Sequence, residues 1–456
     1  MLYNRDKISA IILVLRGYCP KVYSYSNEQF MLKSKYNWIL TLLTLPLLWS
    51  CQEDEEVVIS PITDVEVNLV DTTFQIMKEW YLWNAEMPDV NSDDFETAEA
   101  LIDALRNPLD KWSYIEEEEA YDDFFNNGQY EGYGFRWGLD EEDQLRIAFT
   151  YRDSPFGKLG VDRSWIINKI NGKNMSTIIA NGGVTKEIAE STNTFELLDD
   201  EGNIVTETLT KATIGINTVL HHQIFDVNDT KVGYLVFNSF LATSIDELKP
   251  VFQEFNQAAI DELVLDLRYN GGGRVNVAEY MAANIAGSRV NGRNFIEYIF
   301  NDRQLDENQE VTFNQPDYPL NLDRLITITS KSTASASELV INGLAPFMDV
   351  VVIGENTHGK PVGSFPFKFG GYAINPISFK IANDDGMGEY YRGFAPDAFV
   401  PDDLMHKFGD PQEARLQEAL YFIENGLFLN GTARLEPSSS KNQIEWSGFR
   451  REIGAY

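Results

Sequence analysis

Three short apolar runs, each followed by small or polar residues, most strongly constrain the fold of this chain. They are ELVLDLR (262–268), RLITITS (324–330) and DVVVIG (349–354), and amphipathic helical patterns such as SIDELKPVFQEFNQA (244–258) and VNVAEYMAANIA (275–286) lie between or beside them. Strands that alternate with helices are typical of α/β proteins. The pattern therefore predicts an α/β core over residues 216–430.

Two further segments precede this core. Residues 67–125 place apolar side chains at helical spacing, as in DTTFQIMKEWYLW (71–83) and DDFETAEALIDALR (93–106), which predicts a small helical cap. Residues 126–215 contain short alternating runs, YGFRWGL, QLRIAFTY and WIINKING, separated by Gly and Asp. The predicted fold class is therefore a multi-domain α/β protein with a β-rich middle segment and a polar tail over residues 431–456.

The first 66 residues carry the features of an exported protein. Lys33 and Lys35 precede an apolar stretch of 12 residues (38–49), which is shorter than the roughly 20 that a membrane-spanning helix needs. LWSC, ending at Cys51, resembles the lipobox of bacterial lipoproteins, in which the cysteine is diacylated. We predict a start at Met31, a signal peptide through residue 50, a lipid anchor at Cys51 and an acidic tether to residue 66. An ordinary secretory signal with an incidental cysteine is the alternative.

The cysteine count and the charge limit the partners. Cys19 precedes the predicted start, so Cys51 would be the only cysteine of the mature chain, and no disulfide is expected. The formal net charge of −33 disfavours nucleic acid and anionic membrane surfaces as partners. The acidic tether resembles that of outer-membrane lipoproteins. This resemblance implies that the protein is located in the cell envelope, where it faces either the periplasm or the exterior.

Lys360 lies in GENTHGKP (354–361), which nearly spells the phosphate-binding loop G-x-x-x-x-G-K-[ST]. That loop needs a hydroxyl after the lysine to hold Mg²⁺ and then a helix facing the phosphates. Pro361 has no hydroxyl, and VGSFPFKFGGYA will not form a helix. We therefore exclude a nucleotide site and expect no metal or other cofactor.

The segment TSKSTASASELVINGL (329–344) joins the end of a strand to the start of a helix through small hydroxylated residues. A serine at such a turn is exposed, next to the N–H groups of the helix N-terminus. Ser332 or Thr333 together with Glu338 could instead cap the helix without catalysis. The local residues alone leave capping and catalysis open.

Three blocks in their order resemble the C-terminal processing peptidases, also called tail-specific proteases: LVLDLRYNGGG, STASASE and VIGENTHGK. In that family the first serine of A-S-A-S-E is the nucleophile and the lysine of the downstream G-K is the base. This implies Ser335 and Lys360, which are 25 residues apart as in the family. The resemblance covers residues 67–425. It implies a crotonase-like core and a serine endopeptidase that cleaves polypeptides through an acyl-enzyme.

The residues around this pair suit that chemistry. A lysine takes a proton from serine only when neutral, so its pKa must fall by about three units from roughly 10.4. Burial among apolar groups lowers it, and Lys360 closely follows the apolar run 350–353. We predict that the N–H groups of Ala336 and Gly272 form the oxyanion hole. A tight turn after the strand is the alternative role for Gly272.

Other residues are predicted to support the site. The residues interpreted as lining the site are Gly271, Glu338, His358 and Ser364. For His358 the alternative role is that of the base in a Ser-His-Asp arrangement, and we prefer the lining role. His221 and His222 are interpreted as surface residues of a linker, and Asp266 and Arg268 as organisers of the glycine-rich loop. Ser364 stands where relatives carry a glutamine that orients the lysine. A catalytically inactive peptide-binding lipoprotein of the same fold therefore remains the alternative function.

Residues 126–215 resemble a PDZ domain through YGF (133–135), DSPFGKLGV (153–161) and WIINKINGKNM (165–175), which occur in that order. The resemblance implies that backbone N–H groups hold the C-terminal carboxylate of a polypeptide, which adds a strand to the sheet edge. The residues that would do so are Gly132, Tyr133, Gly134 and Phe135. A β-rich insert without a ligand is the alternative.

Overall fold

The computed structural model describes residues 68–429 of the chain. The predicted start at Met31, the cysteines Cys19 and Cys51, the acidic tether and the polar tail lie outside these residues. Within residues 68–429, no helix combines the length and the apolar composition that crossing a bilayer requires. The described part contains every residue predicted for the catalytic and peptide-binding sites.

Two helices, α2 (Leu69–Trp80) and α3 (Ala98–Leu105), begin the described chain where helical spacing predicts them. The Asn68 side chain caps α2 by accepting from the Val70 N–H at 3.0 Å. Thr97 caps α3 in the same way. Two 3-10 helices lie between them, η1 (Asn84–Glu86) and η2 (Ser92–Asp94). Their shared apolar cluster includes Phe74, Met77, Leu101, Leu105 and Trp112.

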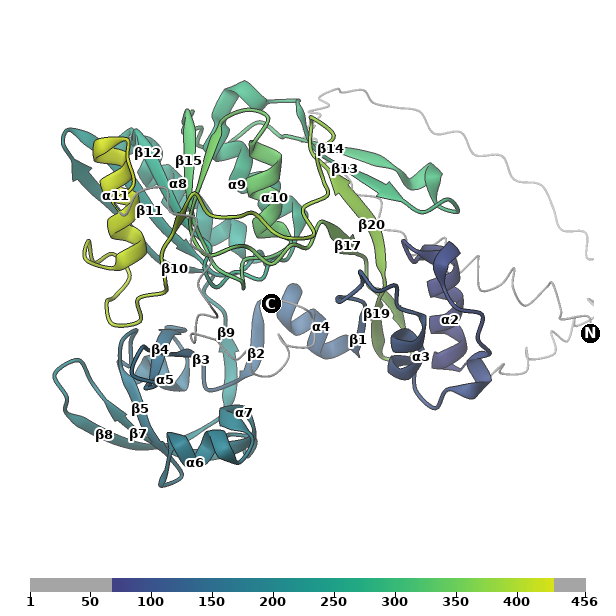
Figure 1. The fold of residues 1–456 in the computed structure, drawn as a ribbon, viewed down its shortest axis with the longest axis horizontal. Coiled ribbons are helices and arrows are strands. Elements are labelled where there is room, and N and C mark those ends of the chain that lie inside the picture. Colours follow the sequence, from purple (N-terminus) through teal and green to yellow (C-terminus); the bar gives the residue numbers. More distant parts are fainter. Residues whose placement is uncertain (1–67, 430–456) are drawn as a thin grey trace, which may run out of the picture. The chain divides into compact units, whose positions relative to one another are not determined.

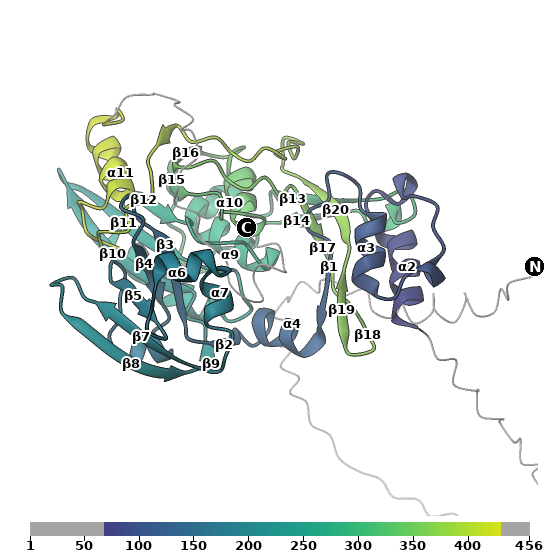
Figure 2. The ribbon, with the colours of Figure 1, turned by 60° about the horizontal axis from the view of Figure 1, so that its bottom comes forward.

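The chain then departs from the predicted all-helical cap. β1 (Tyr114–Glu117) is a strand, and it pairs antiparallel with β19 (Tyr372–Asn375), which in turn pairs with β18 (Phe367–Phe369). The prediction of a helical cap over residues 67–125 was wrong at β1, because the strand's partner lies some 250 residues away and leaves no local signal. Helix α4 (Glu118–Phe125) follows, and Figure 2 shows it next to β2 (Gln129–Gly132).

The middle segment is β-rich, as the alternating pattern predicts. Its sheet has the order β3-β4-β5-β7-β8, with β6 paired to β5, so β3 lies at an edge. The buried cluster beneath it includes Trp137, Ile147, Phe156, Ile167 and Phe195. The strands are β3 (Phe135–Leu139), β4 (Leu145–Thr150), β5 (Ile166–Ile170), β6 (Lys173–Asn174), β7 (Thr192–Leu198) and β8 (Ile204–Thr210). The helices are α5 (Pro155–Lys158), α6 (Met175–Ala180) and α7 (Gly183–Glu187), and β9 (Ala212–Gly215) returns to pair with β2.

The core is built on a six-stranded sheet of order β10-β11-β12-β15-β16-β21. All neighbouring pairs are parallel except β10 with β11. Its strands are β10 (Val219–Val227), β11 (Thr230–Phe237), β12 (Glu262–Asp266), β15 (Arg324–Thr329), β16 (Asp349–Gly354) and β21 (Ala398–Phe399). His221 and His222 lie within β10, so their assignment to a linker was wrong. The antiparallel partner β11 makes this segment a strand.

Helices cover both faces of this core sheet. Figure 1 shows α11 (Ala414–Asn425) on the opposite face from α9 (Val275–Ala286) and α10 (Ala336–Leu344). Helix α8 (Ser244–Ala258) packs against α9. Leu416 and Ala419 of α11 share a buried cluster with Tyr234, Val264 and Ile328 of the strands. Two-sided cover explains why these strands are apolar on both faces.

A second sheet of the core has the order β14-β13-β20-β17. It is formed by β13 (Asn294–Phe300), β14 (Gln309–Thr312), β17 (Val362–Ser364) and β20 (Ile377–Ala382), with the 3-10 helices η3 (Gly287–Val290) and η4 (Leu305–Glu307) beside β13 in the chain. β17 continues directly from the segment that contains Lys360. This agrees with the expectation that no helix follows the lysine.

The core topology brings three loops together. β12, β15 and β16 are parallel neighbours, and loops at the carboxyl ends of parallel strands meet at one edge of a sheet. We call them the glycine loop (residues 267–274), the serine loop (residues 330–335) and the lysine loop (residues 355–360). These three loops carry the residues predicted for catalysis.

Candidate active site

Ser335 ends the serine loop in a strained conformation. Its φ of 54° and ψ of −116° lie outside the regions that L-residues usually occupy, and α10 begins at the next residue. Ser335 is half-buried, whereas its neighbours Ala334 and Ala336 are buried. The turn therefore presents one side chain, that of Ser335, at the start of a buried helix, as expected for a nucleophile held on a sharp strand-to-helix turn.

Lys360 is buried at the end of the lysine loop, with 9% of its surface exposed. Burial lowers the pKa of Lys360 to about 8, although the negative charges of Asp110 and Glu338 oppose part of that fall. Across residues 68–429, no carboxylate forms an ion pair with the lysine. The neutral fraction of this side chain near pH 7 is therefore much larger than that of an ordinary lysine.

The carboxylate of Glu338 links the serine loop to the lysine loop. Its Oε2 accepts from the backbone N–H of Ser335 at 3.0 Å and from that of Lys360 at 2.8 Å. Its Oε1 accepts from the Gly359 N–H and the Thr357 hydroxyl, both at 2.6 Å. Glu338 is fully buried, and burial raises its pKa while these four donors oppose the rise. One side chain thus holds the backbones of both predicted catalytic residues.

These contacts also answer the question of capping. The bond from the Ser335 N–H to Glu338 belongs to a helix-capping arrangement in which Ser335 is the residue before α10. The capping residue is thus Ser335 rather than Ser332 or Thr333. Because Glu338 also binds the lysine loop, its carboxylate both caps α10 and connects the two loops of the candidate site.

Backbone contacts complete the junction of the two loops. The His358 N–H donates to the Thr333 carbonyl at 2.9 Å, and the Glu355 N–H donates to the Thr329 carbonyl at 3.0 Å. The Thr329 hydroxyl donates to the Glu355 carbonyl at 2.6 Å. The lysine loop therefore lies against the end of β15 and against the serine loop.

The glycine loop lies against the start of α10. The Ala334 N–H and the Ser337 hydroxyl donate to the Asn270 carbonyl at 3.1 and 3.0 Å. Gly272 has a φ of +103°, and a Cβ there would lie 2.7 Å from the Ala334 carbonyl oxygen and 2.8 Å from the Ala336 nitrogen. Only glycine fits this approach.

The Gly272 N–H is not free in this structure. It donates to the buried Asn270 side chain at 2.8 Å. The prediction of a ready oxyanion donor at Gly272 therefore needs correction: the turn itself uses that N–H, as its tight-turn alternative requires. Gly271, which is half-buried, adjoins it at the same turn. The Ala336 N–H lies at the first position of α10, directly after Ser335.

His358 is engaged on its ring and cannot readily serve as a base. The indole N–H of Trp112 donates to His358 Nε2 at 3.0 Å, so that nitrogen is an unprotonated acceptor. Burial, followed by the charges of Lys360 and Lys111, lowers the pKa of His358 to about 4, and the ring also bonds the Lys331 backbone. His358 is therefore neutral at pH 7, and its role as a residue that lines the site stays a prediction.

Sequence reasoning missed Asp110 and Trp112, which follow the cap helices. The Asp110 carboxylate accepts from the Tyr81 hydroxyl at 2.9 Å and from the N–H groups of Trp112 and Ser113, each at 2.9 Å. Asp110 influences the lysine loop through its charge, which raises the pKa of Lys360, and Trp112 does so through its hydrogen bond to His358. No periodic pattern marks them, and the only available signal was a tryptophan within the polar run LDKWS.

Ser364 does not take over the role of the family's glutamine. It lies in β17, where it pairs with Ile377 of β20, and within residues 68–429 it forms no hydrogen bond with Lys360. The lysine loop is instead ordered by Glu338 and Thr333. Although Ser364 departs from the family pattern, hydrogen bonds from other residues therefore hold the lysine loop in place.

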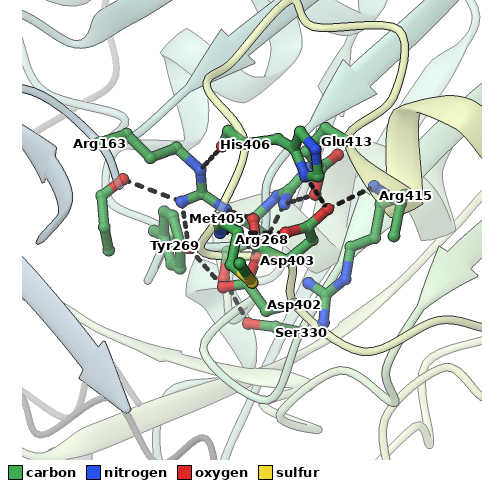
Figure 3. Close-up of polar contacts among 12 residues, drawn as sticks. Arg163, Arg268, Tyr269, Ser330, Asp402, Asp403, Met405, His406, Glu413 and Arg415 are labelled. Atoms are coloured by element: carbon green, nitrogen blue, oxygen red, sulfur yellow. Dashed lines mark hydrogen bonds and ion pairs between the residues drawn. The ribbon is translucent and has the colours of Figure 1, made fainter. Parts of the chain in front are cut away.

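The glycine loop rests on a buried ion network, shown in Figure 3. Arg268 is fully buried and pairs with Asp266 at 2.7 Å, Asp402 at 2.9 Å and Glu413 at 2.6 Å. Burial alone would raise the pKa of Asp402, but the charges of Arg163, Arg415 and Arg268 hold it well below its usual value. The prediction that Asp266 and Arg268 organise the loop agrees with these contacts.

The same network connects the β-rich segment to the glycine loop. Arg163 precedes β5 and is fully buried. It donates to the Tyr269 hydroxyl at 2.7 Å and to Asp402 Oδ1 at 2.9 Å. Tyr269 is three residues before Gly272, so a residue of the β-rich segment contacts the base of the glycine loop (Figure 3).

Residues 132–135, which we call the GYGF loop, border a cleft. Gly132 ends β2, Gly134 has a φ of +80°, and Phe135 begins the edge strand β3. The cleft measures about 560 Å³, and all four residues of the loop line it, together with Phe124 and Ile188. The structure therefore brings the predicted peptide-binding residues to one hollow surface.

Within residues 68–429, no group of three or more His, Cys, Asp or Glu is placed to hold a metal ion.

Comparison with known proteins finds two family models that match parts of this chain. Residues 231–400 match the family model described as "Peptidase family S41", and residues 73–114 match the "Peptidase S41 N-terminal domain". A protein of Picosynechococcus sp. named "Carboxyl-terminal-processing protease" is 23% identical over 341 residues, which are 73% of this chain and 80% of that protein. These matches confirm the resemblance that the three sequence blocks indicate.

Two further similarities extend the comparison. A Staphylococcus aureus protein named "Probable CtpA-like serine protease" is 22% identical over 73% of this chain, which spans 64% of that protein's length. A crystal structure of a Bacteroides fragilis protein assigned to the S41 proteases has a TM-score of 0.64 and 25% identity, and covers 77% of this chain and 96% of its own. The shared fold supports the predicted α/β multi-domain class.

Proposed function

Because the chain carries the domains of peptidase family S41, we propose that it is a serine endopeptidase with Ser335 as nucleophile and Lys360 as general base. The observation that carries the proposal is the carboxylate of Glu338, which binds the backbone N–H groups of both residues. Such a link between the two backbones supports a site that contains both the strained serine and the buried lysine. Further support comes from the bond of the His358 N–H to the Thr333 carbonyl, which also joins the two loops.

In the proposed mechanism, the neutral Nζ of Lys360 takes the proton of the Ser335 hydroxyl as Oγ attacks a peptide carbonyl. The tetrahedral oxyanion is stabilised by the Ala336 N–H and a second N–H from the glycine loop. Its collapse breaks the C–N bond, and the Lys360 ammonium returns its proton to the leaving amine. Water, deprotonated by Lys360, then hydrolyses the acyl-enzyme and restores the Ser335 hydroxyl.

The second oxyanion donor requires a change in the glycine loop. Gly272 is the closest candidate, because a Cβ there would touch the Ser335 Cβ at 2.8 Å. Its N–H would have to exchange its bond to Asn270 for one to the oxyanion. We therefore place Gly272 in the proposed oxyanion hole only once a substrate is bound.

We further propose that the GYGF loop receives the C-terminal end of a polypeptide. Support comes from the cleft beside the loop and from the position of β3 at a sheet edge, where a peptide strand can pair. Glycine at 134 is also needed, since a Cβ there would lie 2.0 Å from the Ser154 Cβ. The N–H groups of Tyr133, Gly134 and Phe135 are the proposed carboxylate ligands.

Attachment to the envelope rests on the sequence alone. We propose a lipid anchor at Cys51, outside the described residues, and a location at the outer membrane that faces either side. Mass spectrometry of the mature N-terminus of the wild type and of Cys51→Ala tests this proposal. A diacylated cysteine in the wild type is expected, and an unmodified one would rule out the anchor.

Cleavage of casein or another unfolded protein tests the catalytic proposal. We expect cleavage by the wild type and none by Ser335→Ala or Lys360→Ala, because each change removes one half of the reacting pair. Ser288→Ala and Lys380→Ala are matched controls at exposed positions and should cleave like the wild type. Equal cleavage by all five proteins would refute the assignment. No cleavage by the wild type would favour the inactive peptide-binding lipoprotein.

A further inference from the structure

The cleft beside the GYGF loop lies between α4 and the β-rich segment. The end of β1 and helix α4 contribute one side, β2 and the GYGF loop another, and the residues at and after α7 a third. Figure 2 shows α4 close to β2. Because α4 belongs to the chain before the β-rich segment, its side chains add recognition groups that the β-rich segment itself does not contain.

The exposed charge of this cleft is negative. Four carboxylates line it: Glu117, Glu119, Asp123 and Glu131. Three of them, Glu117, Glu119 and Glu131, are exposed, and within residues 68–429 no ion pair or hydrogen bond engages their carboxylates. Asp123 accepts from Gln129 at 2.8 Å and from Asn127 at 3.0 Å, which lowers its pKa and keeps it ionised.

The two cations of the cleft do not neutralise this charge at its surface. Lys211 is half-buried, and its Nζ donates to the Ala189 carbonyl at 2.7 Å. Arg136 is buried, with 6% of its surface exposed. An entering ligand therefore meets free carboxylates at the rim.

Aromatic side chains form much of the remaining lining. They are Phe124, Tyr130, Tyr133, Phe135 and Tyr151. Lysine and arginine pair an apolar stem with a cationic end, so they suit a surface of aromatic rings bordered by carboxylates. Acidic side chains upstream of the ligand's C-terminus would lose hydration near these carboxylates and be repelled by them.

We propose that this cleft selects polypeptide segments that carry lysine or arginine beside an apolar residue. The proposal rests on peptide binding by the GYGF loop in the proposed function and adds the class of sequence that is bound. Apolar and aromatic groups of the cleft take the apolar residue, and Glu119, Asp123 and Glu131 attract the cationic side chains. A basic substrate also matches the formal charge of −33 of the whole chain.

Calorimetric titration of the full chain carrying Ser335→Ala tests the proposal without cleavage of the ligand. The probes are three synthetic peptides with one apolar C-terminal sequence and lysines, glutamines or glutamates at the upstream positions. We expect the lysine peptide to bind roughly fivefold more tightly than the glutamine peptide, and the glutamate peptide to bind most weakly. The preference should shrink at high salt, because the rim carboxylates are exposed.

Charge-neutral variants locate the preference. Glu119→Gln combined with Glu131→Gln should bring the lysine and glutamine peptides to nearly equal affinity. Glu201→Gln combined with Glu207→Gln is the matched control, since both side chains are exposed in the β-rich segment away from the cleft. Equal affinity for all three peptides, no binding of any, or an unchanged preference in the first double variant would each overturn the proposal.

The outcome is separable from that of the proposed function. Cleavage of casein by the wild type without a charge preference in the titrations would reject only the basic specificity. A lysine preference in the titrations together with a wild type that cleaves nothing would reject only the peptidase activity.

Discussion

The backbone N–H groups of Ser335 and Lys360 donate to one and the same oxygen, Oε2 of Glu338, at 3.0 and 2.8 Å. Ser335 precedes α10 and Lys360 ends the loop after β16, so this oxygen joins two elements that follow neighbouring strands of the parallel sheet. The relationship makes the geometry of the proposed dyad depend on a third, fully buried residue.

Activity is expected to rise with pH through about 8. The pKa of Lys360 is lowered to about 8, and only its neutral form accepts a proton from Ser335, so kcat/KM should increase as pH rises through that value and then level off. Peptide hydrolysis measured between about pH 6 and 10 checks this. A midpoint near the usual histidine value that disappears in His358→Gln would instead identify His358 as the base.

Glu338→Gln should slow turnover and shift the pH profile downward. The amide cannot accept four hydrogen bonds as the carboxylate does, so kcat should fall by about 100-fold while KM changes little. The lost negative charge no longer raises the pKa of Lys360, so the midpoint should move below that of the wild type. Glu310→Gln, at an exposed position of β14, should change neither quantity. An unshifted midpoint would show that Glu338 does not act on the lysine.

Ser335→Gly should stabilise the protein although it removes the nucleophile. Glycine adopts a φ of 54° without the steric cost that a Cβ brings, so the free energy of unfolding should exceed that of Ser335→Ala by about 1 kcal/mol. Denaturant titration of the two inactive variants measures the difference. Identical stability would mean that the conformation of Ser335 stores no strain.

Arg268→Met should destabilise the protein strongly. It leaves the buried carboxylates of Asp266 and Glu413 without their ion-pair partner, which costs about 3–5 kcal/mol of unfolding free energy. Arg303→Met is the matched control, because its pair with Glu79 is half-exposed and contributes about 0.5 kcal/mol or less. Chemical denaturation followed by circular dichroism gives both values, and similar losses in the two variants would contradict the structural role of the network.

Much of the secondary structure was predictable because its signals are local. The bounds of α8, α9 and β16 agree with the apolar patterns at Ser244–Ala258, Val275–Ala286 and Asp349–Gly354. Strands that depend on remote partners were not predictable in the same way. β1 pairs with β19, and His221 and His222 became part of β10 through pairing with β11.

The candidate site shows the same division. Motif order and spacing led to Ser335, Lys360, Gly272 and Ala336, whereas Asp110 and Trp112 escaped notice because they reach the lysine loop from the cap. The use of the Gly272 N–H by Asn270 also has no sequence signal, since it depends on the turn geometry of the glycine loop.

The resemblance of three motif blocks to a peptidase family predicted the pairing of Ser335 with Lys360, whereas the sequence by itself determined the order of strands and helices. Short-range periodicity and residue type carry that information. Only the tertiary structure decided how burial, nearby charges and hydrogen bonds act on the pair. The lowered pKa of Lys360 and the bridge through Glu338 arise from the parallel placement of β15 beside β16, which brings together groups that are distant in the chain.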